Sequence, residues 1–172
     1  MERVKQLYEL YNETIFRYFA RMTGNMEEAG ELTQETFYQA CLSIHRFRQE
    51  SSPKTWLFSI GRNVYLKHLR NKTRQRTYGW GETLYVADQV PPEVNNPGEL
   101  VLIKETKERI QKALALLPEN ARTILILKEY EELSYEEIAQ IFGQTLNWAR
   151  VTFFRAKQQL GQVYKDLEGD DT

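Results

Sequence analysis

The chain is poor in the residues that build disulfides and metal sites. Its 172 residues include one cysteine, Cys41, and two histidines, His45 and His68. A single cysteine excludes an internal disulfide and favours a reducing compartment. So few Cys and His ligands also exclude a structural zinc site. We therefore expect a cytoplasmic protein with no metal and no cofactor.

Long apolar runs are missing as well. No stretch of about 18 apolar residues is present, so no membrane insertion is expected. The first residues, Met1–Gln6, lack the apolar segment of a secretory signal. Hydrophobic residues make up 41% and charged residues 27% of the chain. These proportions are typical of a globular protein and argue against disordered and collagen-like classes.

No useful stretch alternates between apolar and polar residues as a β-strand would, and apolar residues instead recur at helical spacing. Helices are expected near residues 4–22, 27–44, 53–71, 99–117, 118–129, 134–143 and 145–164. Between them, residues 77–98 are rich in Gly, Pro and Asn, which is typical of a linker. We expect an all-α chain in which two small helical domains, 1–76 and 99–172, are joined by the flexible linker 77–98. Each half alone would be marginally stable at this size.

Charge is distributed unevenly along the chain. The net charge is only −1, yet residues 44–76 hold nine Lys or Arg and one acid, Glu50. Residues 145–165 hold four basic residues and no acid. Two such regions are plausible footprints for a polyanion, although charge runs also occur on ordinary solvated faces.

The region around Gly143 has the spacing of a helix-turn-helix. Ala139 lies four residues before Gly143, and Ala149 lies six residues after it. Small residues are required where the two helices touch, and glycine adopts the left-handed turn without steric cost. Ser134 and Glu137 have the spacing of a capping box, and Thr145 can cap the second helix.

The second helix of this motif has a face suited to DNA. Its outer positions are Asn147, Trp148, Arg150, Val151, Phe154 and Arg155. Asn147 and Arg150 are of the types that hydrogen-bond base edges in the major groove. Arg155 and Lys157 suit phosphates. The alternative is an ordinary antiparallel helical hairpin.

The basic segment of the first half is interleaved with aromatic residues, namely Phe47, Trp56, Phe58 and Tyr65. Cations follow a phosphate backbone, and aromatic faces stack unpaired bases. This combination favours single-stranded or opened DNA over duplex alone. For Trp56, a plain core position is the alternative.

Several motifs resemble a known family. Residues 31–37 (ELTQETF), 47–48 (FR), 51–57 (SSPKTWL) and 62–63 (RN) are similar to region 2 of extracytoplasmic-function (ECF) sigma factors. Residues 116–118 (LLP), 133–139 (LSYEEIA) and 155–157 (RAK) are similar to region 4. ECF sigma factors are dissociable promoter-specificity subunits of bacterial RNA polymerase. The resemblance covers about residues 8–75 and 100–162, in the expected order.

The resemblance implies a role for each group of residues. Docking on core RNA polymerase is implied for Glu31, Leu32, Gln34, Glu35 and Tyr38. Recognition and melting of the promoter −10 element are implied for Phe47, Lys54, Trp56, Arg62, Asn63, Lys67 and Arg70. Binding of the −35 element is implied for Asn147, Trp148, Arg150, Val151, Arg155 and Lys157. Members of this length are mostly regulated in trans, so an anti-sigma protein is an implied partner beside core RNA polymerase and promoter DNA.

Some positions depart from the family pattern. Pro53 stands where an aromatic residue is common, Gln144 replaces an apolar residue at the turn, and Trp148 replaces a small polar one. The departure at Pro53 implies a differently built pocket for the flipped −10 base, and the other two leave the −35 sequence open.

Two other function classes account for part of this pattern. A conventional helix-turn-helix regulator would use Arg150 in the same way, but it leaves the aromatic and basic segment unexplained. A nuclease would need clustered acids to hold Mg²⁺, and Glu50 is the only acid among residues 44–76. No catalytic residues are expected, and the sequence favours a protein that is not an enzyme.

Overall fold

The computed structural model describes residues 1–74 and 97–170, and throughout these ranges the regular elements are helices. The first half contains α1 (Glu2–Thr23), α2 (Met26–Ser43), the short 3₁₀ helix η1 (Ile44–Arg46) and α3 (Pro53–Arg74). The second half contains α4 (Pro97–Leu116), α5 (Glu119–Leu125), the π-helix η2 (Ile126–Tyr130), α6 (Tyr135–Phe142) and α7 (Leu146–Asp170). The all-α prediction is confirmed.

Local signals in the sequence end α1 and begin α2 close to where they were expected. Gly24 has φ 65° and closes α1 in the left-handed conformation. The Asn25 side chain then accepts a hydrogen bond from the Glu28 backbone N–H at 3.0 Å and caps α2. Most of the predicted linker lies outside the described residues. Its last two residues, Pro97 and Gly98, instead begin α4, since proline suits the first turn of a helix.

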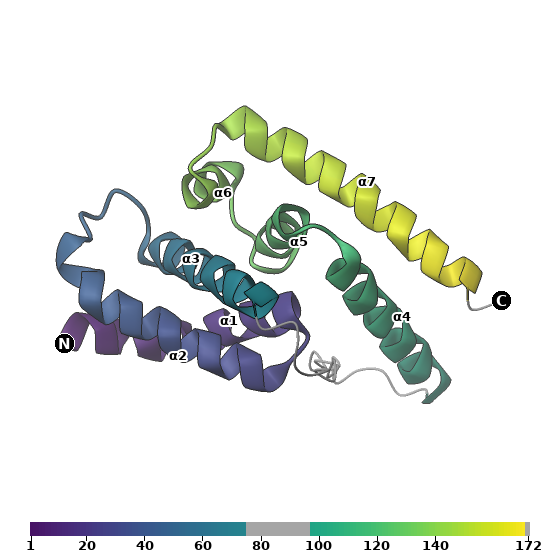
Figure 1. Cartoon of the computed structure of the whole chain (residues 1–172), viewed down its shortest axis with the longest axis horizontal. Helices are drawn as coiled ribbons and strands as arrows, with labels where there is room; N and C mark the ends of the chain where they lie inside the picture. Colours follow the sequence, from purple (N-terminus) through teal and green to yellow (C-terminus); the bar gives the residue numbers. More distant parts are fainter. Residues whose placement is uncertain (75–96, 171–172) are drawn as a thin grey trace.

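α7 is longer than predicted. Helical structure was expected to end near Tyr164, and α7 continues to Asp170. α4 and α7 pack against each other (Figure 1), and the Arg109 guanidinium lies 5.6 Å from the ring centre of Tyr164. Arg109 also pairs with Glu168 at 3.5 Å. These contacts hold the last turns of α7 as helix.

The first half is a bundle of three helices around an aromatic core. Tyr18 and Phe58 meet edge to face with ring centres 5.1 Å apart, and both are almost completely buried. α3 comes close to α1 at Gly61, where an added Cβ would lie 3.3 Å from Phe19 Cζ. The absence of a side chain at Gly61 therefore allows this close approach.

The two halves are joined into one hydrophobic core. Tyr18 and Met22 of α1 are buried together with Thr123 and Ile124 of α5. Figure 1 shows α5 and α6 lying between α3 and α7. Because each half is small, burial against the other half supplies apolar contacts that neither would have alone.

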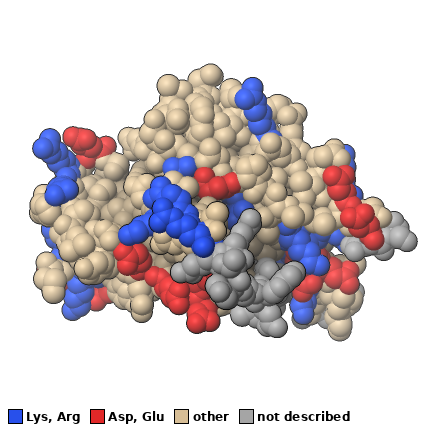
Figure 2. All heavy atoms as spheres, in the orientation of Figure 1, with Lys and Arg blue, Asp and Glu red and all other residues tan. Residues whose placement is uncertain are grey.

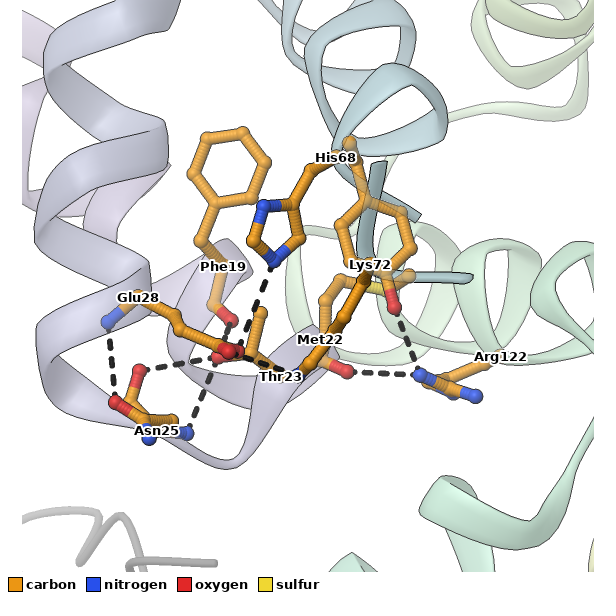
Figure 3. A network of polar contacts seen from close by, with 9 residues as sticks. Phe19, Met22, Thr23, Asn25, Glu28, His68, Lys72 and Arg122 are labelled. Carbon is orange, nitrogen blue, oxygen red and sulfur yellow. Dashed lines mark hydrogen bonds and ion pairs between the residues drawn. The ribbon is translucent and has the colours of Figure 1, made fainter. Parts of the chain in front are cut away.

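A single arginine from α5, Arg122, fastens the second half to the end of α1. Its guanidinium donates hydrogen bonds to the Met22 carbonyl at 2.9 Å and to the Tyr65 hydroxyl at 2.8 Å (Figure 3). It also donates to the Leu114 and Leu117 carbonyls at the end of α4. A cation at two helix C-termini is favourably placed relative to both helix dipoles.

Glu131 lies at another contact between the halves. It is 8% exposed, and its carboxylate lies 3.8 Å from Arg21 Nη1. Burial raises the pKa of Glu131 above its usual 4.5, although Lys54, Arg21 and Arg17 oppose the shift.

Within the described ranges, no helix has the length and apolar character that crossing a bilayer requires.

We expect Arg122→Ala to lower the free energy of unfolding by about 3 kcal/mol, because it leaves several carbonyls at two helix ends without their charged donor. Urea denaturation followed by circular dichroism would measure the loss. The matched control is Arg46→Ala, at an exposed arginine of η1. An equal loss in both variants would contradict the role given to Arg122.

We expect Glu131→Gln to remove a pH dependence of stability. A raised pKa means that the folded chain holds the proton more tightly than the unfolded chain, so wild-type stability should fall as pH rises from about 4.5 through the folded pKa. Relative to the variant, the fall is at most about 1.4 kcal/mol per pH unit. Urea denaturation at several pH values tests this, with exposed Glu132→Gln correcting for the lost charge. The prediction is contradicted if the free energy of unfolding of the wild type minus that of Glu131→Gln stays constant or increases as pH rises.

Candidate nucleic-acid interface

The helix-turn-helix predicted around Gly143 is formed by α6 and α7. Ser134 and Glu137 form the capping box, with hydrogen bonds of 3.1 and 2.9 Å between each side chain and the other residue's backbone N–H. Gly143 has φ 63° and ends α6. The Trp148 backbone N–H donates to the Thr145 hydroxyl at 3.1 Å, which caps α7. Local sequence signals thus fix where α6 ends and where α7 begins.

The outer face of α7 carries the residues predicted for the −35 element. Five of the six are exposed, namely Asn147, Arg150, Val151, Arg155 and Lys157. Trp148 is half-buried, and its ring packs on Phe142 with centres 5.0 Å apart. Lys157 is paired with Glu129 at 3.3 Å.

Phe154 belongs to the outer face expected from the sequence, although it is not among the predicted binding residues. It is 62% exposed on α7, one turn after the exposed residues Arg150 and Val151. A large apolar side chain at this exposure is suited to contact with thymine methyl groups or with a partner.

The start of α3 holds an aromatic stack. Phe47 and Trp56 lie with ring centres 4.7 Å apart and planes tilted by 29°. The Ser52 hydroxyl accepts a hydrogen bond from the Thr55 backbone N–H at 3.1 Å, so the loop before α3 also caps the helix. Trp56 is half-buried, which places it between the two alternatives of core residue and exposed stacking surface.

α3 divides the residues predicted for the −10 element between two faces. Asn63, Lys67 and Arg70 are exposed and line a groove of about 700 Å³ between α2 and α3. Glu31 and Glu35 of α2 line the same groove. In Figure 2, basic side chains gather at the place of α3, next to acidic side chains at the place of α2. The groove therefore has one basic wall and one acidic wall.

The other face of α3 is turned toward the second half. The Arg62 guanidinium donates to Asn120 Oδ1 at 3.0 Å, pairs with Glu119 Oε2 at 3.4 Å and lies 4.1 Å from the ring centre of Phe142. Lys54 Nζ donates to the Glu131 carbonyl at 3.3 Å. The structure therefore separates Arg62 and Lys54 from the three residues on the groove.

The residues predicted to dock on polymerase lie on α2. Glu31, Gln34, Glu35 and Tyr38 are exposed, and Tyr38 is 58% exposed. Leu32 is different, since it is only 4% exposed and belongs to the core. Sequence reasoning passed over Leu42, which is 54% exposed one turn after Tyr38. Leu42 could have been predicted from its spacing, because residues four apart, such as Tyr38 and Leu42, lie on the same side of a helix.

A polar network fixes α2 against α3 at the end of the groove. Figure 3 shows Glu28 between Asn25 and the side chains of His68 and Lys72. The Glu28 carboxylate lies 2.7 Å from Lys72 Nζ and 3.9 Å from His68 Nε2. These contacts hold α2 and α3, the two walls of the groove, in a fixed position relative to each other.

Two buried tyrosines, Tyr18 of α1 and Tyr65 of α3, are held neutral. Burial raises the pKa of Tyr65, although the neighbouring Arg122 opposes the shift. Burial, with Glu119 and Tyr65 nearby, raises the pKa of Tyr18 far above its usual value. Tyr18 therefore acts as an uncharged packing group, and Tyr65 packs in its uncharged form and accepts a hydrogen bond from Arg122. In the part of the chain that the structure describes, no group of three His, Cys, Asp or Glu residues is placed to hold a metal ion.

Comparison with known proteins agrees with this arrangement of elements. Residues 7–75 match the family model of sigma-70 region 2, and residues 107–160 match that of sigma-70 region 4. The chain is 30% identical to the RNA polymerase sigma factor YlaC of Bacillus subtilis, over 92% of this chain and 90% of that protein. It is 29% identical to the ECF RNA polymerase sigma factor SigW of the same organism, over 94% of this chain and 88% of SigW.

Solved structures share the fold. The sigma factor RpoE of Bartonella quintana, solved in complex with the anti-sigma factor NepR, aligns with a TM-score of 0.72 at 23% identity and covers 96% of this chain and 98% of that chain. CnrH, solved in complex with the cytosolic domain of CnrY, aligns with a TM-score of 0.66 at 19% identity, over 96% of this chain and 90% of CnrH. The family resemblance predicted from the sequence motifs is confirmed: the chain belongs to the ECF sigma factors of bacterial RNA polymerase.

Proposed function

We propose that this sigma factor divides its task between its two halves. Residues 1–76 dock on core RNA polymerase and read and open the −10 element, and residues 99–172 read the −35 element. The observation that carries the proposal is the segregation of exposed side chains. Acidic residues and Tyr38 are exposed on α2, basic residues are exposed on α3 beyond the half-buried Trp56, and the exposed charged residues of the first three turns of α7 are basic.

The outer face of α2 is the docking surface in this proposal. Gln34, Glu35 and Tyr38 are exposed there together, which supports contact with a large partner. Leu42 extends the same surface by one turn. Leu32 supports the surface from beneath, because it is buried.

The −10 element is opened at the start of α3. A base that leaves the duplex must be captured to offset its loss of stacking. The aromatic stack of Phe47 and Trp56 offers a ring surface at the start of α3, where Lys54 supplies a cation in the same turn, and Arg62 supplies a second cation further along the helix. Asn63 and Lys67 contact bases further along the strand, and Arg70 contacts phosphate.

The −35 element is read by the first turns of α7. Asn147 and Arg150 contact base edges, and Val151 with Trp148 provides apolar contact. Arg155 and Lys157 contact phosphates, and Lys157 must leave Glu129 to do so.

We further infer that the protein acts in the cytoplasm, without catalysis of its own, and that an anti-sigma protein regulates it. The solved relative RpoE was captured with the anti-sigma factor NepR, which supports a partner of this kind.

The test of the proposal is co-elution of the purified chain with bacterial core RNA polymerase on a sizing column. The complex is then given a duplex library randomised upstream of a transcript, and the transcribed templates are sequenced. A stable complex and two enriched sequence elements are expected. A chain that binds duplex DNA but never binds core polymerase would favour a conventional helix-turn-helix regulator.

We expect Arg150→Ala to weaken recognition of the selected −35 element by about tenfold, because a good contact to a base edge contributes about 1–3 kcal/mol of discrimination. Co-elution with core polymerase should be unchanged. Promoter binding by the reconstituted holoenzyme measures the effect, and Lys165→Ala, at an exposed basic residue further along α7, is the matched control. Loss of polymerase binding in Arg150→Ala would contradict the assignment.

We expect Trp56→Ala to slow promoter opening by about tenfold, because stacking of one base on an aromatic ring contributes about 1–3 kcal/mol. Permanganate reactivity of −10 thymines measures opening. A template with a pre-melted −10 region should restore activity, and Trp56→Phe should retain most of it. A folded Trp56→Ala variant that opens duplex promoters normally would refute the melting role.

A further inference from the structure

The groove between α2 and α3 has two walls of opposite hydrogen-bonding character. Its α2 wall presents Glu31, Glu35 and Gln39, and its α3 wall presents Lys67 and Arg70. Carboxylates only accept hydrogen bonds, whereas the side chains of Lys and Arg only donate them. A ligand that fits between these walls therefore needs donors on one edge and acceptors or an anion on the other.

Contacts within α2 reinforce the acceptor character of its wall. Gln39 Nε2 donates to Glu35 Oε1 at 2.8 Å, which uses one donor of the amide inside the wall itself. The Ser43 hydroxyl donates its only proton to the Gln39 backbone carbonyl at 2.7 Å. These side chains therefore offer a ligand mainly oxygen lone pairs.

The interior of the groove is apolar. Leu32 and Val64 line it and are only 4% and 9% exposed, and the half-buried Ile60 lines it as well. Its volume of about 700 Å³ lies within the range of roughly 300–1,000 Å³ that is common for clefts that hold small organic groups. A flat ring can therefore lie on apolar side chains while its polar edges reach both walls.

We propose that the groove takes one unpaired base of the −10 strand, a cytosine or an adenine, whose exocyclic amine donates to Glu31 or Glu35. The inference rests on the proposed function, because it needs the opened strand to follow α3. Glutamate is a residue type that accepts a hydrogen bond from the cytosine amine. Both bases also carry an acceptor ring nitrogen beside the amine, and this nitrogen suits the donors of Asn63 and Lys67 on the opposite wall.

The acidic wall also discriminates against other groups. Thymine and guanine carry a carbonyl oxygen at the positions where cytosine and adenine carry the amine, and an oxygen that faces a carboxylate is repelled. Glu31 and Glu35 repel a phosphate in the same way, whereas Arg70 attracts it. The backbone of the strand therefore stays on α3, and the base points toward α2.

This site is separate from the aromatic stack at the start of α3. The groove is lined by residues of α2 up to Ser43 and by residues of α3 from Ile60 onward. The stack is formed by Phe47 and Trp56, which precede this part of α3 in the sequence. The two sites can therefore hold different nucleotides of one strand.

The groove also lies beside the candidate docking surface on α2. Glu31, Glu35 and Gln39 follow one another at intervals of four residues and form one row along the helix. Gln34 and Tyr38 form the neighbouring row, which is assigned to polymerase. Because Glu35 is assigned to polymerase as well, the base site is tested on the free chain.

The decisive variant is the full chain carrying Glu31→Ala and Glu35→Ala. The matched control is Glu13→Ala with Glu27→Ala, at two exposed acids outside the lining of the groove. Both variants lose two negative charges, so a general electrostatic gain in DNA affinity would appear in both. If the first variant does not fold, Glu35→Ala alone replaces it, with Glu27→Ala as its control.

The probes are fluorescein-labelled thymine strands of about 12 nucleotides, long enough to cover one single-strand binding surface. Their central positions hold one base of a matched pair, either cytosine and 2-pyrimidinone or adenine and purine. The second base of each pair is the first without its exocyclic amine, so each pair isolates that group. Fluorescence anisotropy of the free chain is measured at low salt, where phosphate contacts are strongest.

In at least one pair, wild type and control should bind the base with the amine about fivefold more tightly than the base without it, because one good contact to a base edge discriminates by this order. Glu31→Ala with Glu35→Ala should bind both members of the pair equally. Arg70→Ala should weaken binding to every strand and leave the ratio within the pair unchanged, since a phosphate contact carries no base information.

Equal affinity of the wild type within both pairs would overturn the base site, and so would a preference that survives the loss of both glutamates. Failure to bind any strand would overturn it too, because Asn63, Lys67 and Arg70 are exposed in the free chain.

The wild-type holoenzyme separates this failure from that of the proposed function. If the holoenzyme selects promoters but the free chain shows no preference for the amine, only the base site is overturned. If the chain never binds core polymerase, the proposed function fails. A preference for the amine that depends on the glutamates would still support a base in the groove.

Discussion

The contact between the two described halves of the chain centres on one guanidinium group. Arg122 reaches from α5 to the last carbonyls of α1 and α4 and to the Tyr65 hydroxyl of α3. It therefore joins both halves at a point where helix ends would otherwise present unpaired acceptors. Around it, Met22 and Thr123 are buried between the halves. Separating the halves would expose the apolar side chains and would also leave the helix-end carbonyls without their charged donor. Water therefore replaces this contact poorly.

The contact around Arg62 is of a different kind, although it joins the same two halves. Its polar partners are side chains, Glu119 and Asn120, and one nitrogen of the guanidinium stays unsatisfied. Arg122, in contrast, uses all three of its nitrogens on the Leu114, Met22 and Leu117 carbonyls. The interface thus has a well-satisfied end at Arg122 and a poorly satisfied end at Arg62.

The sequence predicted those features that local chemistry decides. Gly24, Gly143 and the capping box of Ser134 act within a few residues, so their effect is legible along the chain. The exposed face of α7 followed from helical periodicity. The contact of Arg62 with Asn120 spans 58 positions, and that of Arg122 with Met22 spans 100. Such pairs leave no periodic signal. Sequence reasoning therefore assigned Arg62 to DNA alone and left unseen the face that covers it.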